Sequence, residues 1–266
     1  MRKLTSLFVL GTILLCACGG SKSRTATFKG LEFDSIVVDS MLALTGSENS
    51  PRCEIRLSIQ YAKGENAEKM NALMLRSGVL SPDYLSLSNE KLTTKQSVDS
   101  FVSRFLSEYK QEYGELYRND TEHAASYNCT YKVNTYTQNG ADDVLNYIAE
   151  IYTYGGGAHS INQTIVRNFN VKTGKLIQLD DLFKPGYKPN LCELITKKCI
   201  KQFDVDDFDA LKEKGVFRDG DVYVSENFIL GDDDIVFIYC EDEIAPHSIG
   251  EIRIEIDKDE LESQLK

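Results

Sequence analysis

The sequence lacks an excess of basic residues, and it has no apolar run long enough for a permanent membrane span. It holds 30 Lys and Arg residues against 41 Asp and Glu residues, a net charge of −11. A general phosphate-seeking surface needs the opposite balance, so we expect no nucleic-acid partner. The rest of the composition, 42% hydrophobic and 27% charged over 266 residues, is typical of a globular chain with one large or two small domains.

Common catalytic and metal-binding motifs are also missing. The chain contains no G-x-S-x-G, no H-E-x-x-H and no C-x-x-C. No Walker-type lysine follows Gly155–Gly157, and Asp232–Asp234 lacks the twelve-residue EF-hand spacing and is typical of a solvated turn. The sequence therefore predicts no catalytic residue, no metal site and no cofactor.

The N-terminus has the pattern of a bacterial lipoprotein signal. Arg2 and Lys3 precede the apolar stretch 4–15, which is too short to cross ~30 Å of hydrocarbon. Small Ala17 before Cys18 predicts a signal peptide over 1–17, a lipidated Cys18 and a tether over 18–29. The alternative is an ordinary secretory signal. No acidic run follows Cys18, so we expect a lipid-anchored protein of the bacterial cell envelope, on the periplasmic face of a membrane.

Negative charge is concentrated at the C-terminal end. Residues 203–266 hold 20 acidic and 6 basic residues, whereas the preceding part is nearly balanced. Such a field accelerates association with a cationic partner, and a basic protein is therefore a candidate partner. The alternative is a solvated face that keeps the chain soluble.

Five cysteines follow the predicted lipidation site, an odd number for an oxidising compartment: Cys53, Cys129, Cys192, Cys199 and Cys240. At least one is therefore free or paired between chains. Cys192 and Cys199 lie on a predicted helix about 10 Å apart along its axis, too far for a disulfide. The pairing of the others is left open.

The first part of the chain predicts an α+β fold, an antiparallel sheet packed by a long amphipathic helix. Alternation indicates strands at 31–38 and 53–61, and a three-strand meander at 127–138, 143–154 and 161–171. Apolar residues at steps of three and four predict a helix over 95–117, with Thr93 and Gln96 as a capping box. A tight turn at 172–175 leads into 176–179.

The pattern of predicted helices and strands changes near Leu179, and we predict a smaller α+β domain from there on. A helix is expected over 191–203, followed by strands at 228–230, 235–240 and 252–256 and a short helix at 259–265. Regular β-α-β alternation is absent, which favours α+β over a doubly wound sheet.

Three ordered motifs resemble one family of envelope proteins. They are the glycine-rich turn Tyr154-Gly155-Gly156-Gly157-Ala158-His159, the segment Leu179–Phe183, and Ile235–Gly250 ending in Glu243–Gly250. They resemble the extracellular region of the anti-sigma factor RsiV and the non-catalytic N-terminal region of the peptidoglycan deacetylase PdaC. The resemblance implies a PdaC-like domain over 30–178, an RsiV-like domain over 179–260 and a tail over 261–266.

The resemblance implies binding rather than catalysis. Its RsiV part implies lysozyme, a basic protein, as a ligand, in agreement with the acidic C-terminal quarter. The chain departs from the family in having a lipoprotein signal in place of a membrane span, and the length leaves no room for a separate deacetylase domain. His247 stands where the family pattern has an aromatic residue.

The candidate ligand-binding residues are Tyr154, Gly155, Gly156, Gly157, His159 and His247. The leading hypothesis is a non-catalytic binding module for lysozyme or wall glycan (peptidoglycan). A second hypothesis is a wall-glycan or ester hydrolase that uses His159, with a carboxylate such as Glu241, Asp242 or Glu243 as orienting group. A third is a structural subunit of an envelope complex. Convergence of both histidines and a carboxylate on one cleft would favour catalysis or metal binding, whereas the glycines could equally form a permissive hairpin corner.

Overall fold

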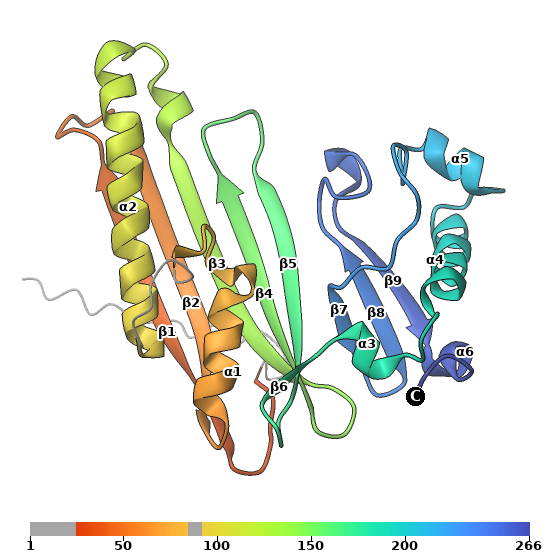
Figure 1. Cartoon of the computed structure of the whole chain (residues 1–266). Coiled ribbons are helices and arrows are strands. Elements are labelled where there is room, and N and C mark those ends of the chain that lie inside the picture. Colours follow the sequence, from red (N-terminus) through yellow and green to blue (C-terminus); the bar gives the residue numbers. More distant parts are fainter. Residues whose placement is uncertain (1–24, 85–91) are drawn as a thin grey trace, which may run out of the picture.

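The computed structural model describes residues 25–84 and 92–266. The predicted signal peptide over 1–17, the lipidation site Cys18 and most of the tether lie outside the described residues. The elements form four layers, in which helices α1 and α2, a six-stranded sheet, a three-stranded sheet and the helices around α4 succeed one another (Figure 1). Among the described helices, none combines the length and apolar character that crossing a bilayer requires.

The first sheet has the strand order of the sequence. It contains β1 (Leu31–Ala43), β2 (Arg52–Gly64), β3 (Cys129–Asn139), β4 (Val144–Tyr154), β5 (Ile161–Asn170) and β6 (Lys175–Ile177). All neighbours pair antiparallel except β2 and β3, which are parallel. The expectation of an entirely antiparallel sheet is therefore wrong at one pair, because the chain crosses one face of the sheet through α1 (Ala67–Met74) and α2 (Thr94–Asn119) before it adds β3.

Helices α1 and α2 cover one face of this sheet (Figure 1). The Thr93 hydroxyl accepts from the backbone N–H of Gln96, and the Gln96 side chain accepts from the backbone of Thr93, so the predicted capping box is confirmed. Phe101 is fully buried and lies 5.5 Å from Tyr131 of β3, ring centre to ring centre. The apolar face of the predicted amphipathic helix therefore packs on the sheet, as expected.

The second part of the chain builds its own small core. Strands β7 (Phe228–Leu230), β8 (Asp234–Tyr239) and β9 (Ile252–Asp257) form an antiparallel sheet, and α4 (Lys188–Gln202) covers it together with α3 (Leu179–Leu182), α5 (Phe208–Glu213) and α6 (Lys258–Leu261). The strict alternation in β9 buries Ile252, Ile254 and Ile256. The α+β fold class is thereby confirmed. The expected extended run over 176–179 instead ends at Ile177, because Gln178 caps α3.

The two sheets are joined by side-chain amides as well as by apolar contact. Asn146 of β4 donates its Nδ2 to the carbonyl of Leu230 and accepts the N–H of the same residue, and Asn168 of β5 donates to the carbonyl of Phe228. A small apolar cluster that includes Ile148, Val166 and Ile238 fills the space between them. These buried amides satisfy the polar edge of β7, and the arrangement holds the second domain against β4 and β5.

Candidate functional site

Two of the three histidines meet at one end of the domain boundary. The rings of His159, in the loop between β4 and β5, and His247, at the start of the 3-10 turn η4 (His247–Ile249), lie 4.1 Å apart between centroids. His247 Nδ1 is 3.1 Å from Glu241 Oε1 and 3.2 Å from Asp242 Oδ2. Ligand atoms of His159, Asp242 and His247 all lie within 4.8 Å of one another. Both histidines and two carboxylates therefore lie together at this point of the structure.

Glu241 is the least exposed member of this histidine cluster, which we define as His159, Glu241, Asp242 and His247. Its side chain is 10% exposed, compared with 36% for His247 and 39% for Asp242. The other carboxylate oxygen of Glu241 accepts the backbone N–H and the side-chain amide of Asn162, at the start of β5. Glu241 therefore links the two domains and presents its free oxygen to His247 in a fixed position.

The loop that carries the carboxylates is folded by its own hydrogen bonds. Glu243 accepts from the backbone N–H of Cys240 at 2.7 Å and from the hydroxyl of Tyr223, and burial together with this carboxylate raises the pKa of Tyr223. Asp242 sits at φ 63°, a left-handed conformation that Asp tolerates better than most residues. This turn points Asp242 at His247.

A groove of about 840 Å³ opens beside the histidine cluster. Its floor is the face of β1–β5 opposite the helices, and its wall in the second domain includes Glu241, Gly250 and Glu251. The floor combines polar and charged groups with one aromatic ring and one exposed aliphatic side chain. The side chains that face it include Val37, Asp39, Arg56, Ser58, Lys132, Asn134, Glu150 and Tyr152. Lys132 Nζ lies 4.9 Å from the centre of the Tyr152 ring. The volume is within the range of small-ligand sites.

The other candidate ligand-binding residues, Tyr154 and Gly155–Gly157, do not all lie beside the histidine cluster. Tyr154 and Gly155 line a separate cavity of about 380 Å³ with Phe105 and Tyr131, which lie on the helix-covered side of the sheet. Gly156 has φ 77°, and a Cβ there would overlap the carbonyl oxygen of Ser126. Gly157 is exposed, with open space where a Cβ would be. The structure thus brings His159 and His247 together, and it places Tyr154 elsewhere.

The five described cysteines are free thiols. Cys192 and Cys199 both lie on α4, as predicted. Cys53 and Cys129 stand opposite each other in the parallel register of β2 and β3, and hydrogen bonding to Cys129 together with burial raises the pKa of the Cys53 thiol. Burial likewise raises the pKa of Cys199 to about 11. These shifts disfavour the reactive thiolate form of both residues.

The hydroxyl groups next to the histidines do not complete a nucleophilic pair. Among the hydrogen bonds of the described residues, none joins Ser160 or Ser248 to either imidazole. Ser–His catalysis requires that hydrogen bond, or a close approach that tightens with substrate.

Sequence reasoning misses the groove and Asn162. It offers Glu241 only as one of three possible carboxylates, because this residue is 82 residues from His159 in the chain. The alternation of polar residues along β2, β3 and β4 does indicate an exposed face, but not that a second domain rises beside it.

The fold and this site define an α+β protein of two sheets, with a groove and a histidine–carboxylate cluster where the two parts of the chain meet. Comparison with known proteins gives its relatives. Residues 180–259 match the family described as "Protein of unknown function (DUF3298)". The chain is 25% identical over 217 residues to the peptidoglycan-N-acetylmuramic acid deacetylase PdaC of Bacillus subtilis (strain 168), which confirms the predicted resemblance to PdaC.

That alignment covers 80% of this chain and 44% of the deacetylase, so the chain spans less than half the length of this relative. The predicted resemblance to RsiV stays a prediction. A crystal structure of a DUF3298 family member from Bacteroides fragilis NCTC 9343 superposes with a TM-score of 0.79 at 26% identity, covering 89% of this chain and 94% of that one. A DUF3298 family protein from Pseudomonas aeruginosa PAO1 superposes with a TM-score of 0.59 at 15% identity, over the same shares of the two chains, and shares the fold.

Proposed function

We propose that this protein is a non-catalytic binding module of the bacterial cell envelope that holds a peptidoglycan segment in the groove between β1–β5 and the second domain. The observation that carries the proposal is the groove itself, whose floor combines polar and charged groups with an aromatic ring and exposed Val37, and whose wall comes from the C-terminal part of the chain. Hydroxyl-rich and amide-rich ligands need convergent donors and acceptors, and Arg56, Asn134 and Glu251 provide them.

The relative supports the ligand class. PdaC is named for its action on peptidoglycan N-acetylmuramic acid, and 80% of this chain aligns with less than half of that protein. A region that this chain shares with an enzyme of peptidoglycan would serve to hold the polymer.

Binding of peptidoglycan in the groove is tested by calorimetric titration of the purified protein with solubilised peptidoglycan fragments. We expect binding by the wild type and at least about tenfold weaker binding by Tyr152→Ala, because an aromatic ring in a polar groove is a typical anchor. Tyr61→Ala is the matched control, since Tyr61 is also on this sheet with a lysine, Lys63, over its ring, yet lies outside the groove. Absence of binding, or equal affinity of Tyr152→Ala and wild type, contradicts the proposal.

We also propose that Cys18 carries the lipid that anchors the protein at the periplasmic face of a membrane. The support is the sequence 1–18 alone. Palmitate labelling in cells should mark the wild type and not Cys18→Ala, which should leave the membrane fraction. A labelled Cys18→Ala protein would refute this attachment site.

A hydrolase is the second candidate, favoured by the meeting of His159, His247 and two carboxylates. Incubation with peptidoglycan fragments or a simple ester, followed by chromatography of products, tests it. Product release that disappears in His159→Ala supports the hydrolase, whereas turnover that survives this substitution refutes the role of His159.

A further inference from the structure

We propose that His159, Asp242 and His247 bind one divalent transition-metal ion of the Zn²⁺ class at the domain boundary. Their ligand atoms all lie within 4.8 Å of one another. Ligands of one tetrahedral ion at about 2.1 Å from the metal are roughly 3.4 Å apart, so small side-chain movements close the site. His159 and Asp242 are both exposed, which leaves them free to make those movements.

The ligand set identifies the class of ion. Two imidazole nitrogens and a carboxylate oxygen suit Zn²⁺ and its first-row neighbours, whereas Mg²⁺ and Ca²⁺ prefer sites built from oxygen alone. Three protein ligands also leave a fourth position of a tetrahedral ion open.

Unbalanced charge is the second observation that points to a cation. Within 4.0 Å, Glu241 and Asp242 have no lysine or arginine partner among the described residues, and their one basic neighbour is the imidazole of His247. Two carboxylates that share one imidazole keep net negative charge, and Glu241 is largely removed from water. A divalent ion would neutralise this charge.

Glu241 is assigned as the positioning residue of this site. Asn162 holds one of its oxygens through two N–H donors, and its other oxygen faces His247 Nδ1 at 3.1 Å. Carboxylates that orient a metal-binding histidine in this way are a common feature of metal sites. An ion here would join the loop after β4 to the loop after β8, and would fix the wall of the groove to its floor.

The test is calorimetric titration of the purified protein with ZnCl₂, together with its melting temperature with and without zinc. We expect one ion per chain and a rise in melting temperature, because a ligand of the folded state stabilises it. His159→Ala and His247→Ala should each weaken binding by at least about tenfold, and Glu241→Gln by about tenfold. Absorption of the Co²⁺-loaded protein should show tetrahedral coordination that is altered in Glu241→Gln, a change that a purely structural role would not cause.

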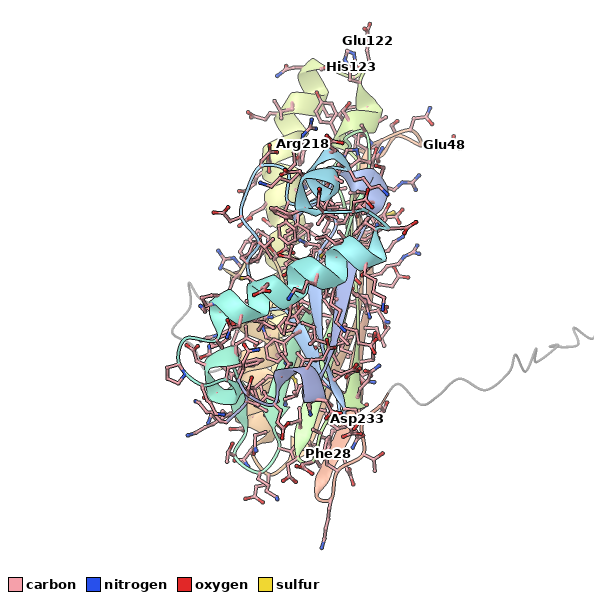
Figure 2. The ribbon with its side chains drawn as sticks, turned by 90° about the vertical axis from the view of Figure 1, so that its right-hand side faces the viewer. Phe28, Glu48, Glu122, His123, Arg218 and Asp233 are labelled. Carbon is pink, nitrogen blue, oxygen red and sulfur yellow. The ribbon has the colours of Figure 1, made fainter. Side chains whose placement is uncertain are left out.

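His123→Ala is the matched control. His123 Nδ1 contacts both oxygens of Asp120 at 2.9 Å, so it is also an exposed histidine–carboxylate pair, but no second imidazole of the described residues is near it. It lies beside Glu122 at one tip of the molecule (Figure 2). Wild-type affinity is expected for this variant. No zinc binding at micromolar to millimolar concentration, wild-type affinity in both His159→Ala and His247→Ala, or loss of binding in His123→Ala would each overturn the proposal. Circular dichroism of every variant shows whether it is folded.

Discussion

The three consecutive glycines Gly155–Gly157 occupy one loop but have different surroundings. Gly156 needs both a positive φ and the absence of a side chain, because the carbonyl of Ser126 lies where its Cβ would be. At Gly155 and Gly157, by contrast, a Cβ would meet open space within the described part of the chain. The motif therefore has a packing role at one position, and this role also sets the path of the loop that leads to His159.

Gly156→Ala should destabilise the protein by about 2 kcal/mol or more, because an alanine there is strained at φ 77° and overlaps the Ser126 carbonyl. Gly157→Ala should stay within about 0.5 kcal/mol of wild type. Urea unfolding followed by circular dichroism measures both. Equal stability of the two variants would show that the loop relaxes around the added methyl group.

At the scale of elements, the contact between β7 and the first sheet depends on asparagines rather than on strand pairing. Asn146 is 1% exposed and makes two hydrogen bonds to the backbone of Leu230. In the sequence, Asn146 appears only as one polar residue within a largely apolar part of β4. The residue that it binds, Leu230 of β7, lies 84 residues away in the chain.

Asn146→Ala should cost about 2 kcal/mol, because it leaves the backbone N–H and C=O of Leu230 without their side-chain partner in a buried position. Asn134→Ala, on neighbouring β3, removes an exposed amide that contacts Glu150 and should change stability by less than about 0.5 kcal/mol. Thermal unfolding by calorimetry compares the two. A loss confined to a separate, early transition would mean that the second domain unfolds alone, whereas a shift of one common transition would mean that the interface couples the domains.

At the scale of the whole molecule, the excess negative charge lies in the C-terminal part of the chain. Residues 203–266 hold 20 acidic and 6 basic residues, and they form most of the second domain. A surface of one sign acts on a charged partner over a distance of about one Debye length, which is ~10 Å at 0.1 M salt. Any role of this field is therefore in the rate of encounter more than in the contacts of a complex.

If a basic protein such as lysozyme is a partner, its association rate should fall by about tenfold or more as salt rises from low to moderate concentration. Surface plasmon resonance measures this rate, with lysine-acetylated lysozyme as the control because it keeps the shape and loses most of the lysine charge. Equal rates for both forms, or rates independent of salt, would exclude steering by the acidic domain. Absence of binding at every salt concentration would remove lysozyme as a partner.

The sequence by itself determined the local structure. The helix over Thr94–Asn119 with its capping box, the meander of β3–β5 and the alternation in β9 follow from patterns of period 3.6 or 2, which state directly which face of each element is apolar. The two histidines in loops beside glycine could also be selected as candidates from sequence, since loops carry exposed polar chemistry.

Only the tertiary structure decided which distant residues meet. The parallel pairing of β2 with β3 places Cys53 opposite Cys129, and the docking of the second sheet brings Glu241 to Asn162 and His247 to His159. The periodicity of a segment shows which of its faces is polar. It does not show which other element packs on that face, because this depends on how the whole chain packs. The groove and the histidine–carboxylate cluster are for this reason properties of the folded chain.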